Sequence, residues 1–374
     1  MARIVIVGGG FGGVVAVQAL AKQLRDEHQI TLISRKDQFL FYPALVRLAF
    51  GDDTADDVTF DLRRSMLDRR INFIKAEVAY IDPDEKRIII AHGQVQGNIP
   101  FDYLIFALGR RLATERIMGF FEHAHHVLDL KGAMKFREAV EKLREGRVVL
   151  GQCAGARLPI PVYEAAFALS RLLRENSTRQ RFEITIVSPE NIQAEFADDQ
   201  MAAILSRTLA EKQIDYIPNF SIKEIEPNSL ISMDSRTVSH DLLMLVPPFA
   251  GSSAARRFSI DADGYINVES TMRVVGMEHI YAVGDCVAFD GPKLGHMAVR
   301  QAEVAAANVI SEISGDESRS HYEHQLTMIL EAGDGEGIYF QKDLWSDEPS
   351  SVRQGRFWSW AKRVHQKYWT AAHT

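Results

Sequence analysis

The residues with the clearest chemical role are the glycines that follow the first apolar run of the chain. Gly8-Gly9-Gly10-Phe11-Gly12-Gly13 has the spacing G-x-G-x-x-G and comes directly after Ile4-Val5-Ile6-Val7. Between a strand and a helix, Gly8 permits a tight turn, Gly10 lets the backbone approach a pyrophosphate, and Gly13 lets helix and strand pack closely. The N–H groups and the dipole of the helix then face the phosphates. The spacing predicts a bound dinucleotide, and a glycine-rich turn without a ligand is the alternative.

The strand after this turn ends without the acidic residue that usually binds a ribose. An aspartate or glutamate commonly closes the second strand of such a unit and holds the ribose hydroxyls, but this chain has Ser34 and Arg35 there. We expect Ser34 to hydrogen-bond the ribose more weakly. Arg35 either faces a phosphate or is solvated.

Two later segments indicate which dinucleotide the first domain binds. Asp102-Tyr103-Leu104-Ile105-Phe106-Ala107-Leu108-Gly109 resembles the motif ending in A-T-G of flavoproteins that bind two dinucleotides, with Leu108 replacing the threonine. Ile280-Tyr281-Ala282-Val283-Gly284-Asp285 resembles the second FAD motif of those proteins, in which the aspartate binds a ribityl hydroxyl. An aspartate after a buried strand can also be a helix cap. Because the three segments occur in the right order, they favour FAD over NAD.

The elements that position these segments alternate between strands and helices. The first strand, a helix over 14–24 and a strand over 30–33 make a βαβ unit. Further strands are expected at 71–74, 87–91 and 103–107, with a hairpin turn over 82–86. A second unit follows, with strands over 147–150 and 183–187 around a helix over 161–176. A strand over 280–283 and a helix over 296–313 then return to the first unit.

This order predicts an α/β fold with two Rossmann-like (FAD/NAD(P)-binding) domains, the second inserted in the first, plus a C-terminal amphipathic tail. We expect the FAD-binding domain at 1–120 and 251–320 and the second, NAD-like domain at 121–250. Residues 321–374 are expected to be an interface or membrane-association segment.

Composition excludes several classes of protein. The chain has 374 residues, a formal net charge of −7 and a pI of about 6.0, which argues against a nucleic-acid partner. Its two cysteines, Cys153 and Cys286, exclude a disulfide scaffold and a cysteine-rich metal site, and no metal ligand set is recognisable among the histidines. No apolar leader and no run long enough to span a bilayer is visible, so we expect a cytoplasmic protein.

Over nearly its full length the chain resembles a group of flavoproteins. The group comprises sulfide:quinone oxidoreductase, flavocytochrome c sulfide dehydrogenase and type II NADH dehydrogenase. Besides the motifs above, the resemblance rests on Gln38-Phe39-Leu40-Phe41-Tyr42-Pro43, Leu245-Val246-Pro247-Pro248-Phe249, Pro292-Lys293-Leu294-Gly295-His296 and the tail from Gly333-Asp334 onward. It implies FAD as the cofactor, a quinone as the acceptor and a small-molecule electron donor. The residues expected to bind FAD are Gly8, Gly10, Phe11, Gly12, Gly13, Ser34, Arg35, Pro43, Val78, Ala107, Gly109, Gly284, Asp285 and Lys293.

Two residues are candidates for catalysis. A cation at Lys293, near the pyrimidine end of a flavin, would stabilise the anionic reduced flavin, although a lysine after a proline turn can equally be a surface residue. Glu164 matches the helix-start glutamate of the NADH dehydrogenases and sulfide enzymes, where a carboxylate can relay protons. The alternative for Glu164 is an acid favoured by the N-terminus of a helix.

The chain departs from the family at both donor sites. The cysteine pair of the sulfide enzymes falls on Leu128 and Leu158, and their third cysteine, near Ile329, is also absent. Leucine has no thiolate, so the sulfur chemistry of the cysteine pair cannot occur at these positions. Cys153 lies in the same loop as Leu158, and we expect it to be a small buried residue. The second dinucleotide loop reads Gly151-Gln152-Cys153-Ala154-Gly155, and its following strand ends at Ser188-Pro189 without an acid, so a tight nicotinamide site is not expected.

The tail combines aromatic and basic residues. Residues 353–374 carry five Lys or Arg and no Asp or Glu, and on a helix Phe357, Ala361, Val364 and Tyr368 share one face flanked by Trp358 and Trp360. Such a face suits a helix that lies on anionic lipid head groups, which would place the protein peripherally at the inner face of the membrane. The alternatives are a helix docked on the protein body or a homodimer contact.

Three functional hypotheses follow. The leading one is an FAD-dependent oxidoreductase of the sulfide:quinone oxidoreductase type that passes two electrons from a small donor to a membrane quinone without the usual cysteine pair. The second is an NAD(P)H:quinone oxidoreductase similar to type II NADH dehydrogenase. The third is a flavin-binding protein that oxidises no donor. The sequence leaves the donor open.

Overall fold

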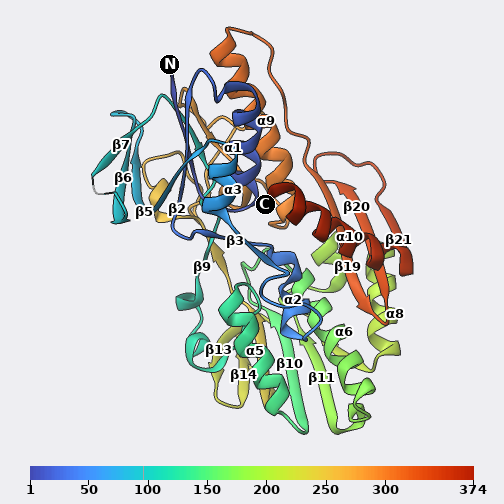
Figure 1. Cartoon of the computed structure of the whole chain (residues 1–374). Coiled ribbons are helices and arrows are strands. Elements are labelled where there is room, and N and C mark those ends of the chain that lie inside the picture. Colours follow the sequence, from blue (N-terminus) through green and yellow to red (C-terminus); the bar gives the residue numbers. More distant parts are fainter. Residues whose placement is uncertain (96) are drawn as a thin grey trace.

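The main layer of the protein is a seven-stranded sheet with the strand order β18-β8-β1-β2-β5-β6-β7. Figure 1 labels β2, β5, β6 and β7 of this sheet. The computed structural model describes residues 1–95 and 97–374. The strands are β1 (Arg3–Val7), β2 (Gln29–Ser34), β5 (Asn72–Asp82), β6 (Arg87–Gly93), β7 (Asn98–Pro100), β8 (Tyr103–Phe106) and β18 (Ile280–Ala282). Strand β1 pairs in parallel with β2 on one side and with β8 on the other. The carboxyl end of β1 is therefore the switch point of the sheet, where ligands of open α/β sheets bind.

Two helices, α1 (Phe11–Leu24) and α9 (Gly295–Ser314), pack against each other on this sheet. Helix α1 is buried along most of its length because its residues are small or apolar. It begins at Phe11 rather than at Val14, so the predicted start was three residues too late. The glycines look like a loop in the sequence, but Gly12 and Gly13 lie inside the first helical turn, where close packing requires them.

A second sheet of four parallel strands has the order β12-β11-β10-β16. Its strands are β10 (Gly146–Gln152), β11 (Phe182–Val187), β12 (Ile214–Ile217) and β16 (Leu242–Val246). The helices of this unit are α5 (Leu130–Lys142), α6 (Ile160–Glu175), α7 (Ile192–Phe196) and α8 (Asp199–Glu211). Beside it lies an antiparallel sheet of β13 (Ile222–Glu226), β14 (Ser229–Ser232) and β15 (Thr237–Ser239). The carboxyl end of β10, between β11 and β16, is a second switch point.

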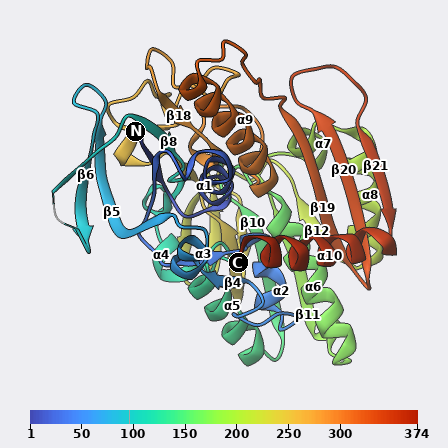
Figure 2. The ribbon, with the colours of Figure 1, turned by 45° about the horizontal axis from the view of Figure 1, so that its top comes forward.

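The C-terminal region contains more structure than the sequence indicated. Strands β19 (Gln325–Gly333), β20 (Glu336–Asp343) and β21 (Ser351–Gly355) form an antiparallel sheet. Alternate residues of β19 are buried, and the strand packs on α6. Helix α10 (Arg356–His373) then runs from this sheet to the middle of the molecule, where the C-terminus lies beside α1 and α3 (Leu62–Asp68) (Figure 2).

The predicted α/β class with Rossmann-like units and a helical tail is confirmed. The domain boundaries at 120, 250 and 320 stay a prediction. The remaining elements are β3 (Gln38–Leu40), β4 (Thr59–Asp61), α2 (Leu45–Ala49), α4 (Phe120–His123), β9 (Arg111–Leu112) and β17 (Phe249–Ala250), besides short 3-10 turns. None of the helices in the described part of the chain combines the length and the apolar run that crossing a membrane requires.

Candidate functional site

The glycine turn lies at the carboxyl end of β1 and leads into α1. Gly8 has a φ of 114°, and a Cβ there would collide with the carbonyl of Ala107 in the neighbouring connection. A Cβ at Gly13 would collide with the carbonyl oxygen of Gly8. A Cβ at Gly10 would meet nothing within 4 Å. The first and third glycines therefore hold strand and helix together, whereas Gly10 faces open space.

The N-terminus of α1 offers free hydrogen-bond donors toward that space. Gly10 caps the helix without a side-chain hydrogen bond, and the first turn holds no acidic residue. The first N–H groups of a helix have no partner within it, and the dipole there attracts negative charge. The turn is thus built to hold a phosphate group.

The end of β2 and the free edge of β5 extend the site along the sheet. Ser34 is buried directly behind Gly9, whereas Arg35 is exposed and lies 3.8 Å from the Glu77 carboxylate. Strand β2 pairs with β5 only as far as Lys75, and the pairing of β5 with β6 is irregular on both sides of Val78. An unpaired backbone edge next to the glycine turn can bind the polar edge of an adenine ring.

Asp285 lies at the other end of the site, after β18, and forms an ion pair with Arg110. Both side chains are largely buried, with 12% and 11% exposed. The Arg110 guanidinium stacks 3.9 Å from the centroid of the Phe249 ring. Arg110 was not predicted, although it directly follows Gly109 and could have been found as a basic residue beside a small-residue motif.

Lys293 is buried near this ion pair and is not a surface residue. Its ammonium donates hydrogen bonds to the carbonyl oxygens of Val287 and Phe289 and lies 4.6 Å from the Tyr265 ring centroid. Burial, with a smaller effect of Arg157, lowers the pKa of Lys293 to about 8. A cation is therefore fixed at the N-terminal end of α9.

Three buried polar atoms around this end have no hydrogen-bond partner among the described residues. They are Tyr42 Oη, Arg110 Nε and Tyr265 Oη. Tyr42 stands beside Pro43 in a short turn. Burying such groups without a partner costs free energy, so they indicate a polar ligand that completes them. An elongated dinucleotide fits this series, from the free edge at Val78, past the phosphate turn, to Asp285 and Lys293.

Glu164 lies in the first turns of α6, away from the glycine turn, and its side chain is only 5% exposed. Its Oε1 contacts the ammonium of Lys362 from α10 and accepts the backbone N–H of Glu331 at 2.8 Å. Burial raises the pKa of Glu164, and Lys362 opposes that shift. The sequence placed Lys362 off the aromatic face of the tail, but nothing in it indicated this partner.

At the second switch point, a largely buried carboxylate accepts hydrogen bonds from the residues around the loop. Glu195, from α7, accepts hydrogen bonds from Gln152 Nε2 and Tyr163 Oη, both at 2.5 Å, and from the Ser188 hydroxyl. Gln152 is the last residue of β10, and Ser188 directly follows β11, where a nucleotide ribose would bind. Glu195 was not predicted because it follows Ser188 by seven residues, too far along the chain for the position of the expected acid.

Both cysteines are free and buried. Cys153 is fully buried, as expected, and burial raises the pKa of its thiol. Burial also raises the pKa of Cys286, to about 12. Leu158 is buried in the main core, and Leu128 packs against it.

An aromatic cluster joins the tail to the glycine turn. The Trp369 ring lies 4.6 Å from that of Phe11 and 4.7 Å from that of Phe39. Phe41 is also in contact, 5.7 Å from Trp369 and 5.4 Å from Phe11. Trp369 was not predicted as a site residue, because on the helix it lies beside Trp358 and off the face formed by Phe357, Val364 and Tyr368.

Comparison with known proteins agrees with this geometry. The model of the pyridine nucleotide-disulphide oxidoreductase family matches residues 2–302. The chain is 25% identical to sulfide-quinone reductase of Aquifex aeolicus, over 98% of this chain and 90% of that protein. It is 23% identical to type II NADH:quinone oxidoreductase of Haemophilus influenzae, over 98% of this chain and 94% of that protein.

The fold is also similar to a solved structure. The crystal structure of the Aquifex aeolicus sulfide:quinone oxidoreductase superimposes with a TM-score of 0.93 and 24% identity, covering 100% of this chain and 91% of that one. In the described part of the chain, no group of three or more His, Cys, Asp or Glu side chains is arranged to hold a metal ion. The chain belongs to the pyridine nucleotide-disulphide oxidoreductase family and is an FAD-dependent oxidoreductase.

Proposed function

We propose that this protein is a peripheral membrane enzyme that takes two electrons from a small donor and passes them through FAD to a quinone. The observation that carries the proposal is the position of α10, which contacts the flavin-binding turn with one face and exposes an aromatic surface with the other. The names of both curated relatives, a sulfide-quinone reductase and an NADH:quinone oxidoreductase, support a quinone as the acceptor.

The outer face of α10 has the character of a lipid-binding surface. Phe357, Trp360, Val364 and Tyr368 are 61%, 58%, 43% and 73% exposed. The helix carries basic residues beside these side chains and no acid. Aromatic side chains flanked by cations bind the head-group region of anionic membranes. We place the protein at the inner face of the membrane, where a quinone dissolved in the bilayer lies next to the Trp369 cluster.

We assign the following residues to the binding of FAD. They are Gly8, Gly10, Phe11, Gly12, Gly13, Ser34, Arg35, Pro43, Val78, Ala107, Gly109, Gly284, Asp285 and Lys293. Bound FAD supplies a carrier that accepts and releases two electrons. Lys293 holds positive charge near it, and Glu164 relays protons for quinone reduction.

The donor that we propose reacts with the flavin directly, without a cysteine pair and without a nicotinamide site. Leu128 and Leu158 cannot form a persulfide, and Cys153 is buried with a raised thiol pKa. Nicotinamide binding is disfavoured because the Glu195 carboxylate already accepts hydrogen bonds from Gln152 and Ser188 where the nucleotide would bind. A thiol, sulfide or hydroquinone that reacts directly with the flavin is the class of donor that this chain allows.

Anaerobic stopped-flow spectroscopy of the holoprotein tests the reaction. The oxidised flavin is mixed with sulfide, thiols, hydroquinones, NADH or NADPH, and the reduced flavin is then mixed with quinone in anionic vesicles. We expect rapid reoxidation by quinone and no rapid bleaching by either nicotinamide. Fast bleaching by NADH would assign the activity of a type II NADH dehydrogenase, and failure of every donor and of quinone would leave a flavin-binding protein without this activity.

Vesicle co-sedimentation tests the membrane assignment. The double variant Trp360→Ser/Tyr368→Ser removes two exposed aromatic side chains and should weaken binding to anionic vesicles about tenfold or more, since each large apolar side chain contributes roughly 1.5–3 kcal/mol when buried. Trp345→Ser, at a 50% exposed tryptophan outside α10, is the matched control. Equal binding of the two variants would contradict the assignment.

A further inference from the structure

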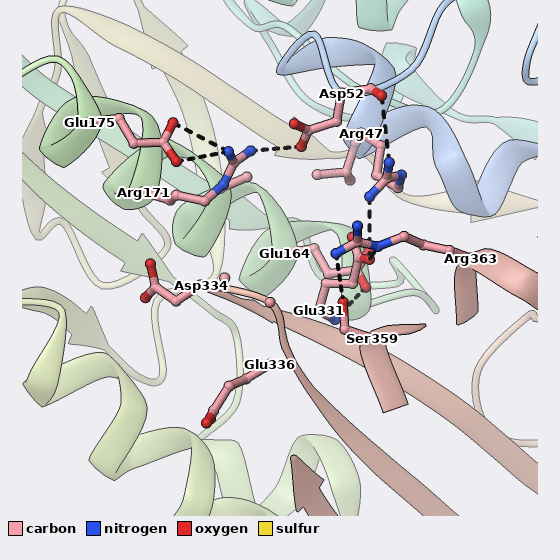
Figure 3. Close-up of a pocket in the computed structure, with 14 residues that line it drawn as sticks. Arg47, Asp52, Glu164, Arg171, Glu175, Glu331, Asp334, Glu336, Ser359 and Arg363 are labelled. Carbon is pink, nitrogen blue, oxygen red and sulfur yellow. Dashed lines mark hydrogen bonds and ion pairs between the residues drawn. The ribbon is translucent and has the colours of Figure 1, made fainter. Parts of the chain in front are cut away.

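Arg47, on α2, is an example of a largely buried arginine with a structural role. Its side chain is 15% exposed, and its Nε and Nη2 both donate to the Asp53 carboxylate at 3.0 Å. Figure 3 shows it at a charged cleft of about 450 Å³, where it also faces Asp52 and Glu331. A guanidinium whose donors are filled in this way holds neighbouring elements together and has little left for a ligand.

Arg110 is buried to a similar extent but is held at one end. Its side chain is 11% exposed, and its Nη1 contacts the Asp285 carboxylate. Its Nε is buried and has no hydrogen-bond partner in the part of the chain that the structure describes. Because a buried donor without a partner costs free energy, we expect this nitrogen to face a ligand.

The backbone fixes Arg110 at the place where the chain leaves the seven-stranded sheet for the inserted four-stranded sheet. Arg110 directly precedes β9, which pairs with β17 so that Leu112 lies opposite Phe249. The guanidinium stacks on the Phe249 ring, 3.9 Å from its centroid. A planar guanidinium that packs on a ring keeps its orientation. Arg110 is therefore a fixed cation between Phe249 and Asp285.

Arg110 belongs to a group of cations around the Tyr265 ring. Lys293 and Arg157 lie 4.6 and 5.5 Å from the centroid of this ring. Burial raises the pKa of Tyr265 to about 12, and Arg157 and Arg110 oppose that shift. Asp285 balances one of these three charges. The group therefore carries an excess of positive charge in a largely buried place.

Three further acids of this region balance the cations less well than Asp285 does. Asp263 and Asp290 are exposed, so water screens their charges. Asp261 is half-buried and accepts the backbone N–H groups of Asp263 and Tyr265 in its own turn. The positive charge at Arg110 is thus set mainly by its contact with Asp285.

We propose that Arg110 raises the reduction potential of the bound flavin by supplying a permanent positive charge beside it, and that Asp285 limits this effect. The inference rests on the proposed placement of FAD at Asp285 and Lys293, and is independent of which donor or acceptor reacts. Uptake of two electrons and one proton converts oxidised flavin to its anionic reduced form. A fixed cation stabilises that anion and so favours electron transfer from the donor.

Equilibrium reduction of the holoprotein against a redox dye of known potential tests this role. Arg110→Gln keeps a hydrogen-bond donor for Asp285 but removes the charge. It should shift the equilibrium about tenfold or more toward oxidised flavin, which is about 30 mV for two electrons. Arg110→Lys keeps the charge and should stay close to the wild type. Arg111→Gln, at the adjacent arginine with a 47% exposed side chain, is the matched control. An unshifted equilibrium in Arg110→Gln, or an equal shift in Arg111→Gln, overturns the role of Arg110.

Variants of Asp285 keep the test decisive if Arg110→Gln alone fails to fold. Asp285→Asn should shift the equilibrium toward reduced flavin and weaken the binding of FAD. The double variant Arg110→Gln/Asp285→Asn leaves no unpaired charge at this contact, and its flavin should be harder to reduce than that of Asp285→Asn. Equal equilibria in these two variants overturn the role of Arg110. If Asp285→Asn changes neither the affinity for FAD nor the equilibrium, the proposed placement of FAD fails as well.

Discussion

Trp369, on the last turns of α10, packs its indole against the ring of Phe11 at the start of α1, with ring centroids 4.6 Å apart. The two residues are separated by almost the whole chain. The contact is reinforced where the backbone carbonyl of His373 accepts a hydrogen bond of 2.6 Å from Ser65 on α3. Helix α10 therefore packs against the start of α1 beside the glycine turn and is a surface element as well.

Replacing Trp369 should damage both stability and flavin retention. Trp369→Ala removes a side chain that is only 6% exposed, and truncating a buried tryptophan costs roughly 3–5 kcal/mol. We expect a lower Tm and faster loss of FAD on dilution, measured by thermal unfolding and by flavin fluorescence. Tyr368→Ala, at the 73% exposed neighbour, should leave both unchanged. Equal retention of FAD in Trp369→Ala and the wild type would show that the tail does not support flavin binding.

Two glycines of the turn should respond differently to the same methyl group. Gly10→Ala has space in the protein and an extended backbone, so the variant should keep its Tm but bind FAD more weakly, because the methyl group approaches the phosphate. Gly13→Ala places Cβ against the carbonyl of Gly8 and should lower the Tm even without FAD. Flavin titration and thermal unfolding of the apoproteins distinguish the two. Identical behaviour would contradict the assigned roles.

Lys293 should make stability depend on pH in the alkaline range. Its pKa is about 8 in the folded protein, below the ordinary lysine value of 10.5, so the unfolded chain binds more protons between these two values. Wild-type stability should therefore rise from pH 8 to pH 10 relative to Lys293→Met, by roughly 2–3 kcal/mol at 1.4 kcal/mol per pKa unit. Denaturant unfolding at each pH measures the difference. Lys131→Met, an exposed lysine, is the control, and parallel curves for Lys293→Met and wild type would refute the prediction.

Removing the carboxylate of Glu195 should destabilise the second domain. In Glu195→Ala, Gln152, Tyr163 and Ser188 lose a shared acceptor, and each buried group left unsatisfied costs about 1–3 kcal/mol. We expect the Tm to fall by several degrees, whereas Glu190→Ala, an exposed neighbour, should leave it unchanged. A stable Glu195→Ala protein that binds NADH tightly would show that the carboxylate only blocks a working nucleotide site.

The parts of the site that depend on local sequence were predictable. The glycine spacing after an apolar run places a strand, a turn and a helix within a few residues, and the steric needs of Gly8 and Gly13 follow from that geometry. The helix containing Glu164 was predicted to within a residue at each end, because apolar periodicity and Pro161 mark its start. The first turn of α1 was misplaced, and β5 (Asn72–Asp82) is longer than the strand expected over 71–74.

The parts that depend on distant partners were not predictable. Arg110 meets Asp285 across 175 positions, and Lys362 meets Glu164 across 198. A single sequence holds no record of such pairings, since a basic residue on a helix face looks the same whether it meets water or a buried acid. The strands from Gln325 onward were missed for a related reason, because β19 packs against α6 while β20 and β21 contact α10.

Strand β18 closes one side of the seven-stranded sheet by pairing with β8, although it is made long after its neighbours. While the ribosome is still adding the inserted unit, β8 is an unprotected edge that can pair with other chains. The inserted sheet takes all its strands from a continuous stretch and can complete itself first. Nascent chains that stall before residue 280 should therefore depend most on chaperones. The complete flavin site can form only at the end of synthesis.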